Sequence, residues 1–157
     1  MQTSFTEKQL ENKENKTSET ILRKCVHCGM CNATCPTYGI NGDELEGPRG
    51  RIYLIKDMLE NNKPANKKIA QHIDSCLSCY SCMTTCPSGV NYMHLIDHGR
   101  NYVEETYKRP LIERTFRNIL SFVLPRPKVF LTLAILTKFI KPFSFLNVLK
   151  LSSFDHQ

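Results

Sequence analysis

Eight cysteines, arranged in two copies of one pattern, are the residues whose type and spacing point most directly to chemistry. Each copy reads Cys-x2-Cys-x2-Cys-x3-Cys-Pro, and the two copies hold every cysteine of the 157-residue chain. The copies begin at Cys25 and Cys76, and they also match at Thr34 and Thr85. This spacing lets a short loop turn three thiolates toward one face of an iron-sulfur cube, with the fourth cysteine directed elsewhere. The sequence therefore predicts two [4Fe-4S] clusters.

Other cysteine chemistry fits this pattern less well. Zinc sites of four cysteines normally use pairs of Cys-x2-Cys rather than a triplet followed by a spaced Cys-Pro. A thioredoxin-type redox pair would stand beside a βαβ pattern, which the sequence lacks. Residues 1–24 contain no apolar run that resembles a signal peptide. We therefore expect a cytoplasmic protein whose thiols bind metal rather than form disulfides.

The ligands of each cluster are assigned by analogy with two-cluster bacterial ferredoxins, in which the fourth cysteine of each copy ligates the other cluster. We expect the first cluster on Cys25, Cys28, Cys31 and Cys86, and the second on Cys76, Cys79, Cys82 and Cys35. Exchanged ligands would bring the clusters close together, so much of the folding free energy would come from the metal.

Helices are expected to position the two cysteine loops, and the predicted fold class is mostly α. Residues 51–60 carry apolar side chains at positions 52, 54, 55, 58 and 59, which is helical spacing. A Gly-Pro pair before this stretch and Asn-Asn-Lys-Pro after it suit the ends of a helix. A second helix from about Ala65 would carry Ile69, Ile73 and Leu77 on one face, and a third would span residues 92–107.

Composition divides the chain into three parts. Residues 1–20 form a polar arm that we expect to be mobile or a frayed helix. Residues 21–108 form an α-helical ferredoxin-type domain with the two clusters. Residues 109–157 form a basic, apolar helical tail, which reads as the start of a missing C-terminal region.

The remaining polar residues give weaker signals, and we expect no catalytic site. Arg49 and Arg51 are interpreted as a solvated helix start, with contact to a cluster or to an acidic partner as the alternative. The nearby acidic residues lack a nucleophile, a base or a pocket signal and read as a polar loop: Asp43, Glu44 and Glu46. Four histidines are interpreted as packed or solvated side chains: His27, His72, His94 and His98.

The formal charge of +6 resides in the last part of the chain, residues 100–157. No nucleic-acid-binding motif accompanies this charge, so we expect no nucleic-acid partner. The longest uncharged stretch there, residues 129–137, is far shorter than the roughly 20 residues that span a bilayer. We interpret the apolar residues as a helix face that packs on a partner, with peripheral association at the inner membrane as the alternative: Phe130, Leu131, Leu133, Ile135, Leu136, Phe139 and Ile140.

Three stretches resemble the iron-sulfur subunits of glycolate oxidases. They are Leu-Arg-Lys-Cys-Val-His-Cys-Gly from residue 22, Gly-Asp-Glu-Leu-Glu-Gly-Pro-Arg-Gly-Arg-Ile-Tyr-Leu-Ile-Lys from residue 42, and Cys-Met-Thr-Thr-Cys-Pro-Ser-Gly-Val from residue 82. The resemblance covers roughly residues 5–124. It implies an electron-transfer subunit that takes electrons from FAD-containing catalytic subunits oxidising glycolate and passes them toward a membrane acceptor. Such a subunit belongs to an oxidoreductase complex but is not catalytic alone.

The chain departs from this family in one respect. The family usually continues into two further cysteine-rich modules with a Cys-Cys-Gly signature, whereas no cysteine follows Cys86. We expect either a truncated product or a separate chain that supplies those modules. Two alternatives stay open: an iron-sulfur subunit of a related dehydrogenase, acting on glycerol-3-phosphate or lactate, and a non-catalytic structural or oxygen-sensing module.

Overall fold

The chain folds into helices joined by short loops. A computed structural model describes residues 1–140, with side chains as far as residue 136, and it contains no strand within that part. The chain divides into two compact units, Met1–Lys108 and a second that begins at Arg109. The predicted mostly α fold class is confirmed.

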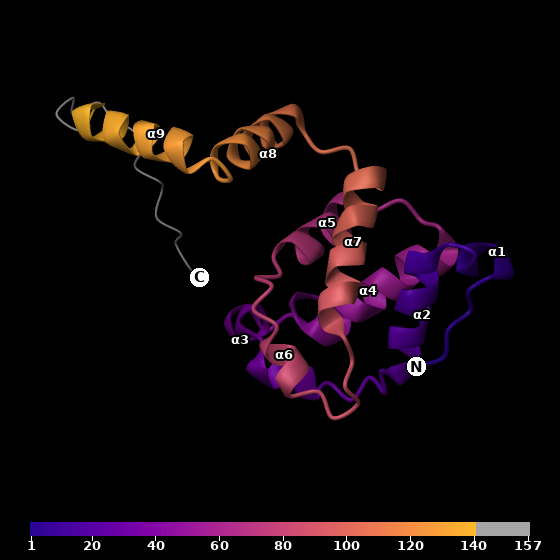
Figure 1. Cartoon of the computed structure of the whole chain (residues 1–157). Coiled ribbons are helices and arrows are strands. Elements are labelled where there is room, and N and C mark those ends of the chain that lie inside the picture. The colour runs from indigo at the N-terminus through magenta and orange to yellow at the C-terminus, as the bar shows by residue number, and fades with distance from the viewer. Residues whose placement is uncertain (141–157) are drawn as a thin grey trace. The chain divides into compact units, whose positions relative to one another are not determined.

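Three long helices, α2 (Lys13–Lys24), α4 (Pro48–Asn61) and α7 (Tyr92–Thr106), frame the first unit and pack against one another (Figure 1). Gly99 of α7 lies against Ile55 of α4, where a Cβ at position 99 would approach the Ile55 Cγ1 atom to 2.8 Å. The absence of a side chain at Gly99 therefore allows the two helices to pack closely.

Short elements connect the long helices and carry the cysteine motifs. In chain order they are α1 (Glu7–Leu10), η1 (Met30–Thr34), α3 (Pro36–Asn41), η2 (Glu44–Glu46), α5 (Lys67–Asp74) and α6 (Ser81–Thr84). The first motif runs from the end of α2 through η1 to the start of α3. The second runs from the end of α5 through α6 to the loop before α7. Each loop is thus held between helices of the same core.

The helix predicted around residues 51–60 is confirmed as α4. Pro48 stands at its first turn, where a missing backbone N–H costs nothing, and Asn62 ends it in the left-handed conformation at φ 47°. The periodic apolar positions turn inward, with Leu54 half-buried and four residues fully buried: Ile52, Ile55, Met58 and Leu59.

The second predicted helix is shorter than expected. It is observed as α5, ends at Asp74 and buries Ile73, but Leu77 lies beyond it with 67% of its surface exposed. The chain leaves the helix here because the second motif needs Ser78 in the left-handed region, at φ 52°, which no α-helix permits. The third predicted helix is confirmed as α7.

The first twenty residues, predicted to be a mobile arm or a frayed helix, are helical over much of their length. They contain α1 and most of α2, and they belong to the same compact unit as the cysteine motifs. Gln9 and Ser18 are buried, and the Gln9 side chain donates to the Leu59 carbonyl at 2.9 Å. The polar composition did not reveal this packing, because the buried polar side chains of Gln9 and Ser18 form their hydrogen bonds inside the fold.

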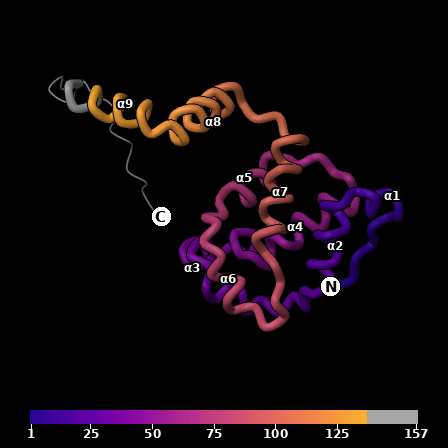
Figure 2. Tube along the Cα trace, viewed as in Figure 1, coloured from indigo at the N-terminus to yellow at the C-terminus, as the bar shows by residue number. Residues whose placement is uncertain are grey.

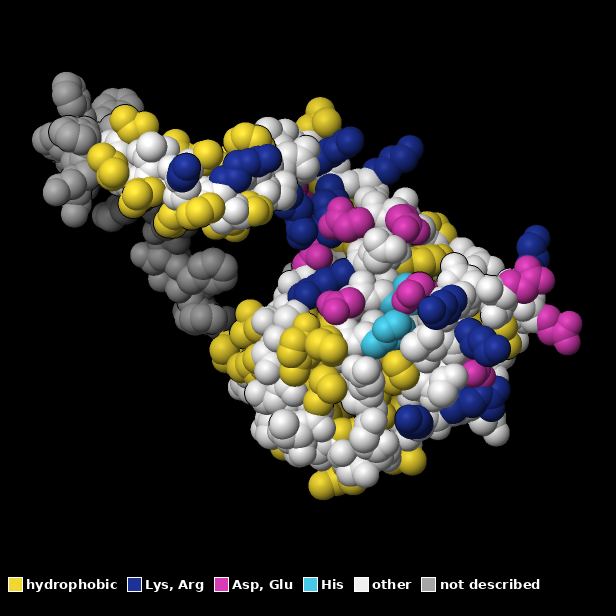
Figure 3. Space-filling model, viewed as in Figure 1, with side chains coloured by type: hydrophobic (Ala, Val, Ile, Leu, Met, Phe, Trp, Pro, Cys, Tyr) yellow, Lys and Arg dark blue, Asp and Glu magenta, His cyan; other side chains and the backbone are white. Residues whose placement is uncertain are grey.

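The second unit contains α8 (Leu111–Val123) and α9 (Pro127–Ile140). Large apolar side chains are exposed along both helices, interspersed with Lys and Arg (Figure 3). No single helix within the described residues is long and apolar enough to cross a membrane; α8 and residues 127–136, bent by 110°, satisfy the length and composition criteria together. The side chains of Phe139 and Ile140, and all of residues 141–157, lie outside the described part.

Candidate metal centre

The two cysteine motifs follow the same backbone path. Two residues in each adopt left-handed angles at equivalent positions: His27 and Gly29 in the first, Ser78 and Tyr80 in the second. The backbone bonds repeat as well, since the Asn32 amide donates to the Gly29 carbonyl at 2.9 Å and the Met83 amide to the Tyr80 carbonyl at 2.9 Å. Left-handed angles are costly for residues other than glycine and concentrate at functional sites. Their recurrence indicates a loop shape required by what it binds.

The two motifs also meet each other. Element η1 of the first packs against α6 of the second, as the chain trace shows (Figure 2). The matching threonines of the repeat join directly, because the Thr85 hydroxyl donates to the Thr34 hydroxyl at 3.0 Å. The Thr34 hydroxyl in turn reaches the Ser81 carbonyl at 3.3 Å. The two copies of the sequence repeat therefore pack directly against each other.

The first pocket brings the fourth cysteine of one motif to the triplet of the other. It has a volume of about 450 Å³ and is partly open to solvent. Its cysteines are Cys25, Cys28, Cys31, Cys82 and Cys86. The apolar residues beside them include Ile52 and Val90, both buried.

The second pocket mirrors the first. It has a volume of about 300 Å³, and its cysteines are Cys35, Cys76, Cys79 and Cys82. Cys82, Pro48 and Tyr92 line both pockets, so a thin wall separates them. The structure therefore brings together all eight cysteines predicted from sequence, in two adjacent groups.

The surroundings of two of the thiols raise their pKa values and so disfavour the thiolate form. Burial, together with the neighbouring thiolate Cys25, raises the pKa of Cys31 to about 11. Burial raises the pKa of Cys82 to about 12, with Cys31 and Cys76 adding to the effect. By contrast, hydrogen bonds from Ser81 lower the pKa of the exposed Cys79. A positively charged metal group offsets such repulsion and releases the thiol protons on binding.

These residues fit iron-sulfur clusters. The metal-binding side chains of each pocket are thiols, which are the ligands of [4Fe-4S] clusters. Within residues 1–136, no three His, Cys, Asp or Glu side chains are grouped around the position of one metal ion.

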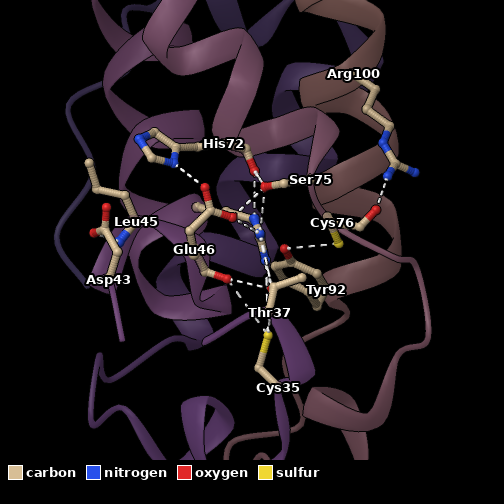
Figure 4. A network of polar contacts seen from close by, with 11 residues as sticks. Cys35, Thr37, Asp43, Leu45, Glu46, His72, Ser75, Cys76, Tyr92 and Arg100 are labelled. Carbon is tan, nitrogen blue, oxygen red and sulfur yellow. Dashed lines mark hydrogen bonds and ion pairs between the residues drawn. The ribbon is translucent and has the colours of Figure 1, made fainter. Parts of the chain in front are cut away.

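A buried polar network, missed from the sequence, supports the second pocket (Figure 4). Arg51, predicted to be solvated, is only 1% exposed and forms an ion pair with Glu46 at 2.8 Å. Glu46, predicted to lie in a polar loop, also accepts from His72 Nδ1 at 2.6 Å and from the Ser75 hydroxyl. Helical periodicity does not reveal this burial, because the partners come from η2 and α5.

Arg100 is a second residue that sequence reasoning missed. From α7 its guanidinium donates to the Cys76 carbonyl and to the Ser78 hydroxyl, both at 2.6 Å. Figure 4 shows the contact with Cys76. It thereby clamps the second motif around its left-handed turn. The arginine lies well beyond the motif in sequence, so spacing offered no signal.

The other singled-out polar residues mostly match their interpretations. Asp43 caps η2 through the Leu45 amide at 2.9 Å, and Arg49 is partly exposed and pairs with Glu44 at 2.8 Å. All four histidines are half-buried or buried, and none is placed among the pocket cysteines except His27, at the rim of the first pocket: His27, His72, His94 and His98.

Comparisons with known proteins agree with this geometry. Residues 21–90 match the 4Fe-4S dicluster domain. The chain is 53% identical over 143 residues to the glycolate oxidase iron-sulfur subunit of Escherichia coli, covering 91% of this chain and 35% of that relative. It is 34% identical over 117 residues to the probable glycolate oxidase iron-sulfur subunit of Bacillus subtilis, covering 71% of this chain and 26% of that relative.

A more distant similarity, 29% over 76 residues, links the chain to the succinate dehydrogenase iron-sulfur subunit of Paracoccus denitrificans. No solved structure matches the chain significantly. The chain spans about a third or less of the length of these curated relatives. On its paired cysteine pockets and these similarities, the chain contains a 4Fe-4S dicluster domain and is similar over most of its length to the iron-sulfur subunits of glycolate oxidases.

Proposed function

We propose that the chain is the electron-transfer part of a flavin-dependent glycolate oxidase complex. The observation that carries the proposal is the pair of adjacent cysteine-lined pockets that share Cys82 and Tyr92. Two redox groups separated by so thin a wall suit the relay of single electrons. The names of the relatives from Escherichia coli and Bacillus subtilis supply the substrate.

The grouping of the cysteines supports the ligand sets expected from the sequence. We assign the first cluster to Cys25, Cys28, Cys31 and Cys86, and the second to Cys76, Cys79, Cys82 and Cys35. A [4Fe-4S] cluster held in such a site supplies a one-electron couple. Cys82 is placed with the second set because it belongs to the Cys76 triplet, although it also lines the first pocket.

In this proposal the oxidation of the substrate and the transfer of its electrons take place on different subunits. Oxidising a hydroxy acid removes two electrons together with protons, which needs an acceptor for both. The sequence holds no Gly-rich dinucleotide fingerprint and no acid-base constellation beside a substrate pocket. The two-electron step therefore takes place on a flavin held by other subunits, and this chain receives electrons from it singly.

The test is reconstitution under anaerobic conditions. The purified chain should carry about eight iron and eight sulfide, as two cubes require. Glycolate should not reduce these clusters until the flavin subunits are added. Reduction by glycolate in the absence of flavin would overturn the division of labour. Reduction by lactate or glycerol-3-phosphate in place of glycolate would assign the chain to a related dehydrogenase.

We infer that the second unit is an interaction surface of a cytoplasmic protein. Its support is the row of exposed apolar side chains on α8 and α9 among basic residues: Leu111, Ile112, Phe116, Ile119, Phe122, Phe130 and Leu131. A partner helix is the preferred occupant, because such faces most often pack on protein. Flotation of the chain with vesicles of phosphatidylglycerol, and not of phosphatidylcholine, would instead assign this surface to the membrane.

A further inference from the structure

We propose that Arg51, anchored by Thr37, raises the reduction potential of the second cluster above that of the first, so that a single electron shared between the two clusters rests on the second. The inference rests on the proposed function, since it assumes the assigned ligand set that includes Cys35. Arg51 and Thr37 act as positioning residues: they touch a ligand rather than the reacting atoms of a substrate.

The geometry around Cys35 places a buried cation beside the sulfur. The Arg51 Nη1 atom lies 4.0 Å from the Cys35 Sγ atom, and the Thr37 Oγ1 atom lies 3.2 Å from it. Arg51 also donates to Thr37 Oγ1, from Nη1 at 3.2 Å and from Nη2 at 3.1 Å. The Thr37 hydroxyl itself donates to the Glu46 carbonyl at 2.7 Å, so Thr37 anchors the guanidinium, and the guanidinium places its charge beside the sulfur.

The ion pair is oriented with its positive end toward Cys35. The second oxygen of the Glu46 carboxylate is engaged by His72 Nδ1, while the Ser75 hydroxyl donates to the oxygen that Arg51 also bonds. In Figure 4 that carboxylate lies near His72 and Ser75, while Cys35 lies at the opposite end of the network. Arg51 is almost wholly buried, so its charge is weakly screened and acts strongly on a neighbouring sulfur.

A second donor adds to the effect on the same pocket. The Tyr92 hydroxyl lies 3.7 Å from the Cys76 Sγ atom, and Tyr92 is itself buried. Hydrogen bonds and positive charge at ligand sulfurs stabilise the more negative, reduced state of a cluster and therefore raise its potential.

The first pocket offers no equivalent set. Ser88 occupies the repeat position of Thr37, yet within the described residues no side-chain donor bonds the Cys86 sulfur. Arg49 lines this pocket, but its side chain is 33% exposed and paired with Glu44, so water screens its charge.

The experiment is an anaerobic potentiometric titration of the whole chain, followed by EPR. Variants Cys86→Ser and Cys35→Ser identify which signal belongs to which cluster. In the wild type the second cluster should be reduced first. The double variant Arg51→Met with Glu46→Gln removes the charge pair without leaving a buried carboxylate unpaired. It should shift the electron-sharing ratio at least tenfold toward the first cluster, which is about 59 mV for a one-electron couple.

Two further variants separate tuning from folding. Thr37→Val should shift the ratio in the same direction but less, and Ser88→Ala, at the matching position of the first pocket, should leave it unchanged. Arg51→Lys keeps the positive charge, so it should shift the electron-sharing ratio less than the double variant does. Should the double variant fail to assemble both clusters, Thr37→Val decides the outcome.

Equal shifts of both potentials, or none in a variant that retains eight iron, would overturn the inference. So would a wild type in which the first cluster is reduced first. Iron and sulfide counts on the wild type are made beforehand, because a chain without two clusters would contradict the proposed function instead.

Discussion

The two cysteine motifs are nearly the same loop set in different surroundings. Both turn through two left-handed residues, and both present an exposed second cysteine, Cys28 or Cys79. They differ in what holds their first cysteine: the Cys25 carbonyl accepts from the amino group of Met1, whereas the Cys76 carbonyl accepts from the guanidinium of Arg100.

The difference extends to the fourth cysteines. Thr37 and Arg51 lie beside the sulfur of Cys35. Among the described residues, no side-chain donor bonds the sulfur of Cys86. A repeated loop thus determines that two similar groups bind, and the non-repeated helices around it determine how those groups differ. This is a means by which one chain makes two redox sites unequal.

The largest expected effect comes from replacing the fourth cysteine of either motif. Cys86→Ser should abolish or convert the cluster of Cys25, Cys28 and Cys31, although Cys86 belongs to the other motif, and Cys35→Ser should do the same to the second cluster. Each variant loses one of four thiolate ligands, which a hydroxyl does not replace. EPR and iron content of the purified variants measure the outcome. Loss of the Cys76 cluster in Cys86→Ser would show that the ligands are not exchanged.

The next effect concerns the close approach of α4 to η2. Gly50 of α4 lies so close to η2 that a Cβ there would sit 2.1 Å from the Glu44 carbonyl oxygen. Gly50→Ala should therefore cost about 3 kcal/mol of folding free energy, since backbone rather than a flexible side chain must move. Urea unfolding of the loaded chain measures this.

Gly39→Ala is the matched control. Gly39 lies in α3, with nothing within 4 Å of the Cβ position. Alanine is the better helix former, so this variant should gain up to about 1 kcal/mol. Equal destabilisation by both variants would mean that the tight approach of α4 to η2 is not what matters.

A smaller effect is expected at the clamp on the second motif. Arg100→Met removes two hydrogen bonds, to the Cys76 carbonyl and the Ser78 hydroxyl, and should cost about 1–3 kcal/mol. The variant should lose iron to a chelator faster from the second cluster than from the first. Arg23→Met, at an exposed arginine of α2, is the control and should change stability by less than about 0.5 kcal/mol. Uniform iron loss from both clusters would argue against a local clamp.

The smallest effect is a pH dependence where α2 meets α7. His98 Nδ1 pairs with the Ser18 hydroxyl at 2.7 Å, and burial lowers the pKa of His98, with His94 adding to the decrease and Glu14 and Glu105 opposing it. The folded state therefore binds this proton less readily than the unfolded state. The stability that His98 contributes is present above its unfolded pKa of about 6.5 and is lost as the pH falls toward the lower folded value.

The measurement is the urea midpoint of the wild type and of His98→Gln at pH 7.5 and at pH 6. The wild type should lose more stability between these two values than the variant does. An equal loss in both proteins would assign the acid sensitivity to other groups, such as the clusters themselves.

The sequence alone determined the chemistry of the centre and the main helices. Cysteine spacing is local, so the loop that turns three thiols inward can be read directly from residues 25–36 and 76–87. The periodic apolar positions of residues 51–60 likewise identify α4, because a helix buries one face whatever its partners are.

Only the tertiary structure decided which polar residues serve the centre. Arg51 and Glu46 read as solvated because their types are usually exposed, and their burial depends on His72 and Ser75, more than twenty residues away. The packed N-terminal helices and the Arg100 clamp were hidden for the same reason. Burial and hydrogen-bond partnership are properties of residues distant in sequence, and no local pattern of residues encodes them.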